Sequence, residues 1–568
     1  MAFLKNSLAR WLFALFVGIN FSVPIWAHRV IIGGGHIGLM DALLADQAGE
    51  DRIDIYTKKT VKESTAANIW NSHTHNEIVS VIPPSNRINE LLGIDFDKQG
   101  ISAYDLPGTQ KSVSAKKFID AVKRFGRDLK TQKLNDKALE DMGVKAMSKW
   151  KSFNKEAKGP LANLFERSSF NPCGDSEEAA HGEMRKGYRI DLMYGFPDVK
   201  ATAKKLLEEL GEEGAKYKYM RELSPDEVAS RDPSLKNFVL ANSIDKGGSR
   251  EWKEGVTAIW RPGGSLDTET FLPGVPSVLQ ERMGDRFSMR ENHEVTGLSF
   301  EQDKRSGEYL ITGMEFKDRP GISFRYPEAI RFDIVPGEAV GTLERLGLFE
   351  SPYAAFAGCS LKLEVDISNN PALLEEYKNF RHHMEVHKPG IVLAWQARLR
   401  DGKLFVGGAG TKAFYGDVEP KPIEGDGPHE KFPEVNNLRQ LQMFRDVLPH
   451  VVALGMGVDI KELPAEMTQQ HLNDLVKKGV ATRWVGRRSV RYNGMPSVGF
   501  VYHNGKKVRN GTTITHGGSG GGSFSLILAM LNNYAFDPEK YLPDLLAVGL
   551  TKGQADDILS LTDSRLEP

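Results

Sequence analysis

Three glycines near the start of the chain have the spacing that binds the pyrophosphate of a dinucleotide. Residues 33–38 form a G-x-G-x-x-G motif between a β-branched segment at 29–32 and an Ala- and Leu-rich segment. Gly33 allows a tight turn, Gly35 lets backbone N–H groups approach phosphates, and Gly38 lets a helix pack on a strand. The phosphates would lie at the positive end of that helix. The segment therefore predicts a dinucleotide-binding strand, turn and helix, with these cofactor contacts: Gly33, Gly35, His36, Ile37 and Gly38.

The end of the next predicted strand leaves the choice of nucleotide open. Residues 52–56 predict a strand at the usual distance after the glycines. An acidic residue normally follows this strand and binds the ribose hydroxyls, but here Thr57 is followed by Lys58 and Lys59. The threonine hydroxyl can bind a ribose, and the lysines either pair with a phosphate, as in an NADP site, or form a solvated strand end. We place Thr57 and Lys58 among the predicted cofactor contacts.

Composition excludes several classes of partner. The 568 residues include 74 basic and 75 acidic side chains, so no overall field favours nucleic acid. The two cysteines, Cys173 and Cys359, suit neither a disulfide framework nor a metal cluster. The histidines at 73 and 75 lack Cys or carboxylate partners at ligand spacing, and those at 382–387 alternate along a predicted strand. We therefore predict no metal site.

The first 27 residues predict an export signal. Lys5 and Arg10 precede an apolar run at 11–27 that Gly, Asn, Ser and Pro interrupt. Such a run is typical of a secretory signal peptide, whereas a membrane span needs about 20 continuous apolar residues. Cleavage after Ala27 would release a chain that starts at the first strand. We expect an exported, periplasmic protein; the alternative is association with the inner membrane through an uncleaved segment.

The rest of the chain alternates predicted strands and helices, which indicates an α/β protein with strand-rich insertions. Residues 114–157 have a Lys-rich helical pattern, residues 293–300 and 309–316 predict paired strands, and residues 268–283 predict a helix despite two prolines. The predicted divisions are a signal peptide or anchor at 1–27, dinucleotide-binding parts at 28–95, 259–345 and 481–568, a largely helical insert or substrate domain at 96–258, and a β-rich substrate domain at 346–480.

Four separated segments resemble one family. They are the glycine motif, the turn at 262–267 (PGGSLD), the strand at 404–410 (LFVGGAG) and residues 484–499 (WVGRRSVRYNGMPSVG) before 512–520 (TTITHGGSG). The chain is similar to the FAD-dependent oxidoreductases of the D-amino-acid oxidase type, which include D-amino-acid dehydrogenase, sarcosine oxidase and glycine oxidase. The fourth segment looks like that family's W-x-G-x-R-P-x-T-P-D-G-x-P-x-x-G. It departs from that pattern at Ser489, Arg491, Tyr492 and Asn493.

The resemblance implies a Rossmann-like FAD-binding domain interrupted by a mixed, strand-rich α+β substrate domain. It implies that FAD accepts a hydride from a small amino or hydroxy acid. Arg488 would bind the substrate carboxylate through its planar guanidinium, and Arg491 is the alternative for that role. The further implied cofactor contacts are Ser64, Thr65, Asn68, Gly486, His516, Gly517, Gly518, Ser519 and Gly520.

Two other functions stay open. Residues 63–71 (ESTAANIWN) are similar to a segment of malate:quinone oxidoreductase, so a flavoprotein of that type at a membrane is one alternative. A dinucleotide-binding protein without retained catalysis is the other. The electron acceptor, quinone or oxygen, and the exact substrate are not predicted.

Overall fold

The computed structural model describes residues 28–62, 121–170, 188–204, 221–262, 266–337, 341–378, 381–388, 391–416, 431–516 and 524–565, with gaps at 122–123, 126, 169, 196–198, 202 and 564. The expected signal segment at 1–27 lies outside these residues. Within them, no helix combines the length and apolar character needed to cross a membrane.

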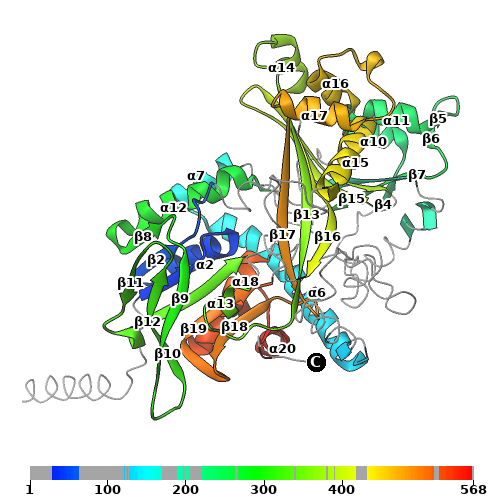
Figure 1. The fold of residues 1–568 in the computed structure, drawn as a ribbon. Coiled ribbons are helices and arrows are strands. Elements are labelled where there is room, and N and C mark those ends of the chain that lie inside the picture. The colour runs from blue at the N-terminus through cyan, green and yellow to red at the C-terminus, as the bar shows by residue number, and fades with distance from the viewer. Residues whose placement is uncertain are drawn as a thin grey trace, which may run out of the picture.

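A parallel-rich sheet forms one layer of the molecule (Figure 1). Its main path runs β11-β10-β19-β12-β1-β2-β8, with β9 paired to β10 and β18 to β19. The five strands from β19 to β8 run parallel. The strands are β1 (His28–Ile32), β2 (Arg52–Tyr56), β8 (Phe287–Arg290), β9 (Val295–Gln302), β10 (Tyr309–Phe316), β11 (Arg319–Ser323), β12 (Ile330–Gly337), β18 (Ser497–His503) and β19 (Lys506–Thr515).

Both faces of β1 are buried, which explains why the strand is continuously apolar. Ile31 packs into a core with the helices, whereas Val30 and Ile32 pack into a second core with β10, β12 and α13. The helices contributing to the first core include α2 (His36–Gln47), α6 (Leu129–Glu156), α7 (Pro160–Arg167), α12 (Thr268–Met283), α18 (Ser525–Phe536), α19 (Pro538–Ala547) and α20 (Lys552–Thr562); α13 spans Thr342–Arg345.

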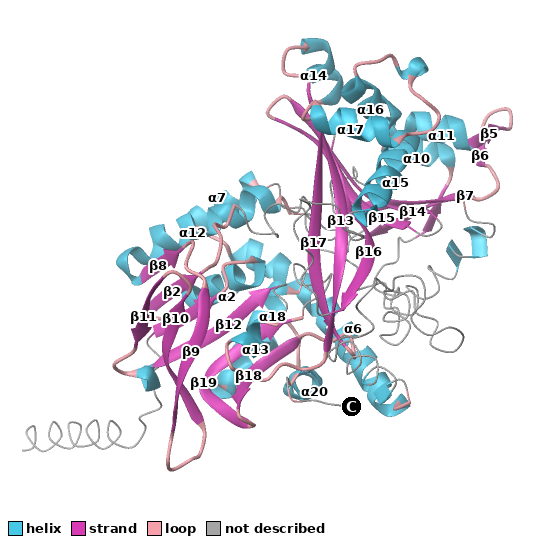
Figure 2. Cartoon of the chain, in the orientation of Figure 1, coloured by secondary structure: helices cyan, strands magenta, loops and turns pink. Residues whose placement is uncertain are grey.

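A second, mostly antiparallel sheet has the order β17-β13-β16-β15-β14-β3-β7-β4 (Figure 2). Its strands are β3 (Tyr188–Tyr194), β4 (Arg221–Leu223), β7 (Val256–Pro262), β13 (Tyr353–Asp366), β14 (Arg381–Lys388), β15 (Ile391–Arg400), β16 (Lys403–Gly416) and β17 (Ala481–Arg491). Near it lie α10 (Pro225–Arg231), α11 (Lys236–Asn242), α14 (Pro371–Tyr377), α15 (Lys431–Val447), α16 (Pro449–Met456), α17 (Gln469–Lys477) and the pair β5 (Ser243–Asp245) and β6 (Arg250–Trp252).

The chain passes between the two sheets several times. The first sheet takes β1 and β2, then β8 to β12, then β18 and β19, and the intervening strands β3, β4, β7 and β13 to β17 form the second. This arrangement confirms the α/β class. The predicted boundary before residue 481 groups β17 with the FAD-binding part, but β17 pairs with β13 in the second sheet. A strand pattern is local and does not reveal the pairing partner, and the division into domains stays a prediction.

Several local signals are confirmed. α12 forms despite Pro273 and Pro276, and residues 295–302 pair antiparallel with 309–316. The structure also shows a reciprocal cap at α10, where the Ser224 hydroxyl accepts from the Glu227 N–H and the Glu227 carboxylate accepts from the Ser224 N–H. The Lys-rich pattern at 114–157 is not one continuous helix in the described residues, because Asp128 caps a new helix, α6, through the Thr131 N–H.

Buried charged side chains tie the sheet to its helices. Arg29 on β1 places Nε 3.1 Å from Asp333 Oδ2 and Nη1 3.4 Å from Asp41 Oδ1, and donates from Nη2 to Asn533 Oδ1 at 2.7 Å. Arg331 also donates to Asp333 at 2.9 Å. Buried charges are tolerated only when they are paired and hydrogen-bonded. This cluster therefore fixes β1, β12, α2 and α18 relative to one another.

Two further side chains complete the environment of Asp333. Thr512 donates its hydroxyl proton to Asp333 Oδ1, and Asn532 Nδ2 donates to the same oxygen at 3.0 Å. The positive charges of Arg331 and Arg29 outweigh burial and hold the pKa of Asp333 below its usual range. Burial, with the neighbouring Asp333, raises the pKa of Asp41 to about 7. The network therefore extends to β19. Of its two carboxyl groups, that of Asp41 is protonated more readily than that of Asp333.

Removing the carboxylate at the centre of this network should destabilise the protein strongly. We expect Asp333→Ala to lower the free energy of unfolding by about 3–5 kcal/mol, because Arg29 and Arg331 would stay buried without it. Glu251→Ala is the control, since its ion pair with Lys246 (3.8 Å) is half-exposed and such pairs contribute about 1 kcal/mol or less. Urea denaturation measures both. Equal, small losses would contradict the structural importance of the network.

Candidate functional site

The turn between β1 and α2 is packed so closely that two of its glycines are obligatory. Gly33 has a φ of +124°, and a Cβ there would lie 1.9 Å from the Val335 carbonyl oxygen. A Cβ at Gly38 would lie 2.0 Å from the Gly33 carbonyl oxygen. The Gly33 N–H donates to the Tyr56 carbonyl at 2.8 Å. The first and third glycines of the motif are therefore needed because backbone atoms occupy the space of a side chain, as the sequence predicts.

Gly35 is different, because nothing described lies within 4 Å of the Cβ that a side chain would add. Gly35 is the N-cap of the 12-residue helix α2, with an extended backbone, no side-chain cap and no acidic residue in the first turn. The N–H groups at such a helix start need an outside partner, and an anion is the partner they favour. Open space, uncapped N–H groups and the helix dipole together fit a pyrophosphate.

The two residues that follow Gly35 face the protein interior. The His36 ring packs edge-on against Trp150 of α6, with ring centroids 6.0 Å apart. Burial lowers the pKa of His36 to about 4, so the ring is neutral at pH 7. Ile37 is buried in the helical core. Any contact that these residues make with phosphate would therefore come from the backbone of the first helical turn.

At the end of β2, Thr57 and Lys58 contact the last residue of β8 and the segment that follows it. The Thr57 N–H donates to the Arg290 carbonyl at 3.1 Å, and the His293 N–H donates to the Thr57 carbonyl at 2.8 Å. Lys58 Nζ lies 2.8 Å from Glu294 Oε1 in an exposed ion pair. An NADP phosphate at this strand end would have to replace Glu294 as the partner of Lys58.

His516 follows the last residue of β19 at the same edge of the sheet. Ile32 of β1 pairs with Ile334 of β12, and Ile334 pairs with Thr513 of β19. His516 therefore lies two strands from the glycine turn, about 10 Å away across the sheet. Parallel sheets bind ligands at this carboxyl edge. Two segments far apart in sequence thus meet where one extended dinucleotide can reach both.

His516 itself is strained and buried. Its φ of +58° lies in the left-handed region, which non-glycine residues seldom adopt. The ring stacks on Tyr353 at 4.8 Å between centroids, and burial with the nearby charge of Arg491 lowers the His516 pKa to about 3. Nε2 lies 3.5 Å from Glu350 Oε1. Sequence reasoning missed Glu350 and Tyr353, because neither belongs to a motif.

Arg491 makes contacts that belong to the protein's own packing. Its side chain is buried, and its guanidinium donates to the carbonyls of Pro496 (3.3 Å), Leu561 (3.1 Å) and Asp563 (3.0 Å). These bonds fasten the end of α20 to the segment after β17. We therefore assign Arg491 a structural role in place of the alternative carboxylate anchor, and the sequence could not show this because α20 is distant along the chain.

Several predicted residues are placed only by backbone or lie outside the described residues. In the β13–β17 ladder, Arg488 pairs with Phe356 and Gly486 with Gly358, so both lie on the strand that leads to Arg491. The remaining predicted contacts lie outside the described residues: Ser64, Thr65, Asn68, Gly517, Gly518, Ser519 and Gly520. Among the residues that the structure does describe, no group of three or more His, Cys, Asp or Glu side chains is arranged to bind a metal.

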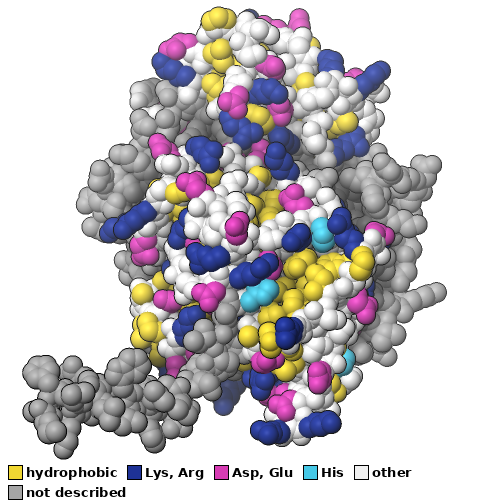
Figure 3. All heavy atoms as spheres, turned by 90° about the vertical axis from the view of Figure 1, so that its left-hand side faces the viewer, with side chains coloured by type: hydrophobic (Ala, Val, Ile, Leu, Met, Phe, Trp, Pro, Cys, Tyr) yellow, Lys and Arg dark blue, Asp and Glu magenta, His cyan; other side chains and the backbone are white. Residues whose placement is uncertain are grey.

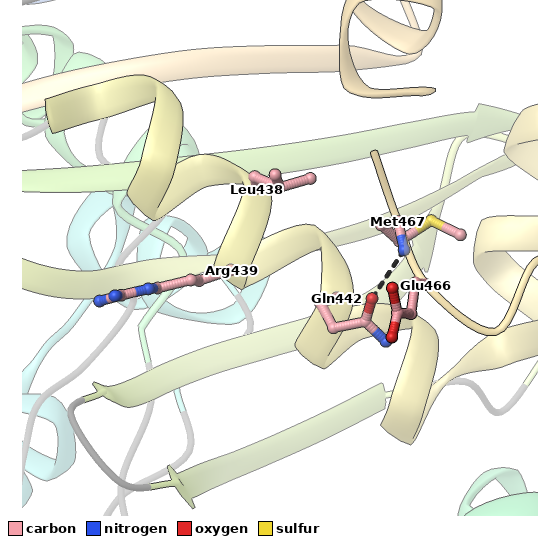
Figure 4. A pocket seen from close by; sticks show the side chains of 5 residues that line it. All are labelled: Leu438, Arg439, Gln442, Glu466 and Met467. Carbon is pink, nitrogen blue, oxygen red and sulfur yellow. Dashed lines mark hydrogen bonds between the residues drawn. The ribbon is translucent and has the colours of Figure 1, made fainter. Parts of the chain in front are cut away.

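A separate hollow of about 390 Å³ lies on the second sheet's helical side (Figure 4). Its lining residues are Leu438, Arg439, Gln442, Glu466 and Met467. Gln442 Oε1 accepts a hydrogen bond from the Met467 N–H at 2.7 Å, which joins α15 to the segment before α17 (Figure 4). None of the predicted site residues lines it.

Basic and acidic side chains are interspersed on the face shown in Figure 3. This mixture agrees with the whole sequence, which has 74 basic and 75 acidic residues. The described residues of this face form no extended basic stripe of the kind that binds a nucleic-acid backbone.

Comparisons with known proteins found no matching family model and no matching curated protein. Solved structures that are similar include glycine oxidase from Bacillus cereus ATCC 14579 (13% identity, TM-score 0.47, covering 90% of this chain and 95% of that one). Another is L-proline dehydrogenase from P. horikoshii (12%, 0.47, 93% and 99%). A third is L-alpha-glycerophosphate oxidase from Mycoplasma pneumoniae with FAD bound (11%, 0.48, 90% and 94%). With TM-scores below 0.5, these similarities decide neither the family nor the activity of this chain.

The open space at Gly35 gives a direct test of the site. We expect Gly35→Val to stay folded with a somewhat lower melting temperature, since valine is a poorer N-cap than glycine. It should bind FAD about 10- to 100-fold more weakly, because the side chain would displace charge-assisted phosphate hydrogen bonds of about 1.5–3 kcal/mol each.

The matched control is Gly553→Val, since Gly553 lies in the first turn of a helix, α20, and has nothing within 4 Å of its missing Cβ. Fluorescence titration with FAD measures both variants. A Gly35→Val protein with wild-type affinity would show that the dinucleotide binds elsewhere.

Proposed function

We propose that this protein is an FAD-dependent oxidoreductase of the D-amino-acid oxidase type, which oxidises a small amino or hydroxy acid by hydride transfer to the flavin. The observation that carries the proposal is the contrast among the three motif glycines. Gly33 and Gly38 are closed off by backbone, whereas Gly35 is open at an uncapped helix start. This is the division of roles that a dinucleotide pyrophosphate requires.

The choice of FAD rests on segments beyond the glycine turn. The stretches that resemble the flavoprotein family, 484–499 and 512–520, include most of β17 and the end of β19. β19 brings His516 to the sheet edge that carries the glycine turn. A cofactor bound at the turn therefore meets family-like residues at its other end. The ion pair between Lys58 and Glu294 counts against a 2′-phosphate at the ribose end.

In this proposal the chain binds and orients, and the flavin supplies the redox chemistry when it is bound. The N–H groups at the start of α2 hold the pyrophosphate. Arg488 holds the substrate carboxylate through its bidentate guanidinium. Arg491 is already engaged by three carbonyls, so Arg488 is the arginine of this segment that we assign to the substrate.

The location of the protein is part of the proposal. The apolar run at 11–27 and the start of β1 at His28 support export with cleavage after Ala27. The mass of the mature protein tests this, since an intact Met1 would contradict cleavage.

The substrate class can be tested with Arg488. We expect FAD-loaded protein to bleach under argon with at least one member of a panel of small amino and hydroxy acids. Arg488→Ala should then raise KM roughly ten- to a thousand-fold, about 1.4–4 kcal/mol, with FAD still bound. Arg488→Lys keeps the charge but loses the fork, so its KM should fall between those of Arg488→Ala and the wild type.

Arg483→Ala on the same strand is the control, because Arg483 donates to Asn473 of α17. If Arg488→Ala had unchanged kinetics, either the substrate would not be a carboxylate or Arg488 would not be the residue that binds it. A panel without any bleaching would favour a flavin-binding protein without catalysis on such acids.

A further inference from the structure

A buried acid and a buried imidazole meet at the carboxyl edge of the first sheet. Glu350 precedes β13 and His516 follows β19, and each side chain is only 1% exposed. Glu350 Oε1 lies 3.5 Å from His516 Nε2, which is the long limit of a hydrogen bond. Catalytic and binding contacts are often long in the unliganded protein and shorten when a ligand binds.

The pair has unused hydrogen-bonding capacity. Among the described residues, Glu350 Oε2 and both ring nitrogens of His516 have no hydrogen-bond partner. Polar atoms that are buried without partners are costly, and they cluster where a protein awaits a ligand or a proton. The left-handed φ of +58° at His516 adds local strain, which also accumulates at such sites.

The side chains that surround Glu350 and His516 determine whether each member of this pair is charged at pH 7. The Tyr353 ring of β13 stacks on His516, and Arg491 of β17 lowers the pKa of His516. The charge of Glu344 on α13 raises the pKa of Glu350, whereas a hydrogen bond from the Glu344 backbone and the charge of Arg345 lower it. Burial is the dominant cause for both members, raising the pKa of Glu350 to about 8 and lowering that of His516 to about 3. Both groups are therefore neutral at pH 7, with one proton on each.

We propose that Glu350 is the positioning residue of His516: its protonated carboxyl donates to Nε2, so that Nδ1 carries the ring proton and donates it to a carbonyl of the bound cofactor. Nε2 is the ring nitrogen nearer Glu350, so a donor there fixes the tautomer. A flavin offers carbonyl oxygens on its pyrimidine edge. This inference rests on the proposed function and adds to it a residue that lies 166 positions from its partner.

Substitutions at Glu350 separate positioning from packing. Glu350→Gln keeps a neutral donor near Nε2, whereas Glu350→Leu removes it, and Glu328→Gln on the exposed turn before β12 is the control. At pH 7 we expect Glu350→Leu to weaken FAD binding at least tenfold, and the other two variants to stay within threefold of wild type. Glu350→Leu with wild-type affinity would overturn the proposal.

The pH dependence provides a second readout, independent of activity. Above pH 8 the wild-type carboxyl loses the proton that it donates, so FAD affinity should fall between pH 7 and 9, and Glu350→Gln should abolish this fall. In the apoprotein, the pKa of Glu350 is about 8 in the folded chain, above its unfolded value of 4.5. The stability that this carboxyl contributes is therefore fully present below pH 4.5 and is lost as the pH rises through 8. The melting temperature of wild type should therefore drop more between pH 6.5 and 9 than that of Glu350→Gln.

The two arms also separate this inference from the proposed function. Wild-type protein that binds no FAD would overturn the proposed function and with it the role in cofactor binding. Equal pH dependence of the melting temperature in wild type and Glu350→Gln would show that Glu350 carries no proton at pH 7, and would overturn its role as the donor to His516. The second result does not depend on Glu350→Leu folding or on any cofactor.

Discussion

The buried contact between Arg29 and Asp333 holds the parallel strands of the first sheet and their helices together. Arg29 lies on β1 and Asp333 on β12, and their side chains meet 3.1 Å apart with no solvent exposure. Asp41 of α2, Asn533 of α18 and Thr512 of β19 complete the network. An ion pair in this position is not chiefly a source of stability, because desolvation offsets most of its attraction. It restricts which elements can lie together, since any other arrangement leaves a buried charge unpaired.

The candidate site depends on that restriction. Asp41 is on the same helix that begins at the glycine turn, so the network sets how α2 sits on the sheet. Close packing of the helix on β1 is what requires Gly38 and what leaves the space at Gly35 open. Thr512 connects the same network to β19, whose end carries His516. One buried cluster therefore positions both ends of the proposed cofactor site.

The sequence predicts the elements whose signals are local. The spacing of Gly33, Gly35 and Gly38 correctly predicts the turn, and alternating residues predict the pair formed by β9 and β10. Contacts between distant segments have no such signal. Arg29 and Asp333 look like ordinary charged residues in strands, and only the parallel pairing of β1 with β12 makes them partners. Arg491 and Glu350 take their roles from residues about 70 and 166 positions away, so sequence patterns could not assign them.

Titration of the purified apoprotein with FAD, alongside NAD⁺ and NADP⁺, most directly tests whether this fold is built around a flavin dinucleotide. Isothermal calorimetry gives the stoichiometry, and the absorption spectrum after gel filtration shows whether flavin is retained. We predict one FAD bound per chain and no measurable binding of either nicotinamide dinucleotide. Binding of NADP⁺ in preference to FAD, or binding of none of the three, would contradict the assignment of the β1–α2 turn and the end of β19 to a single flavin site.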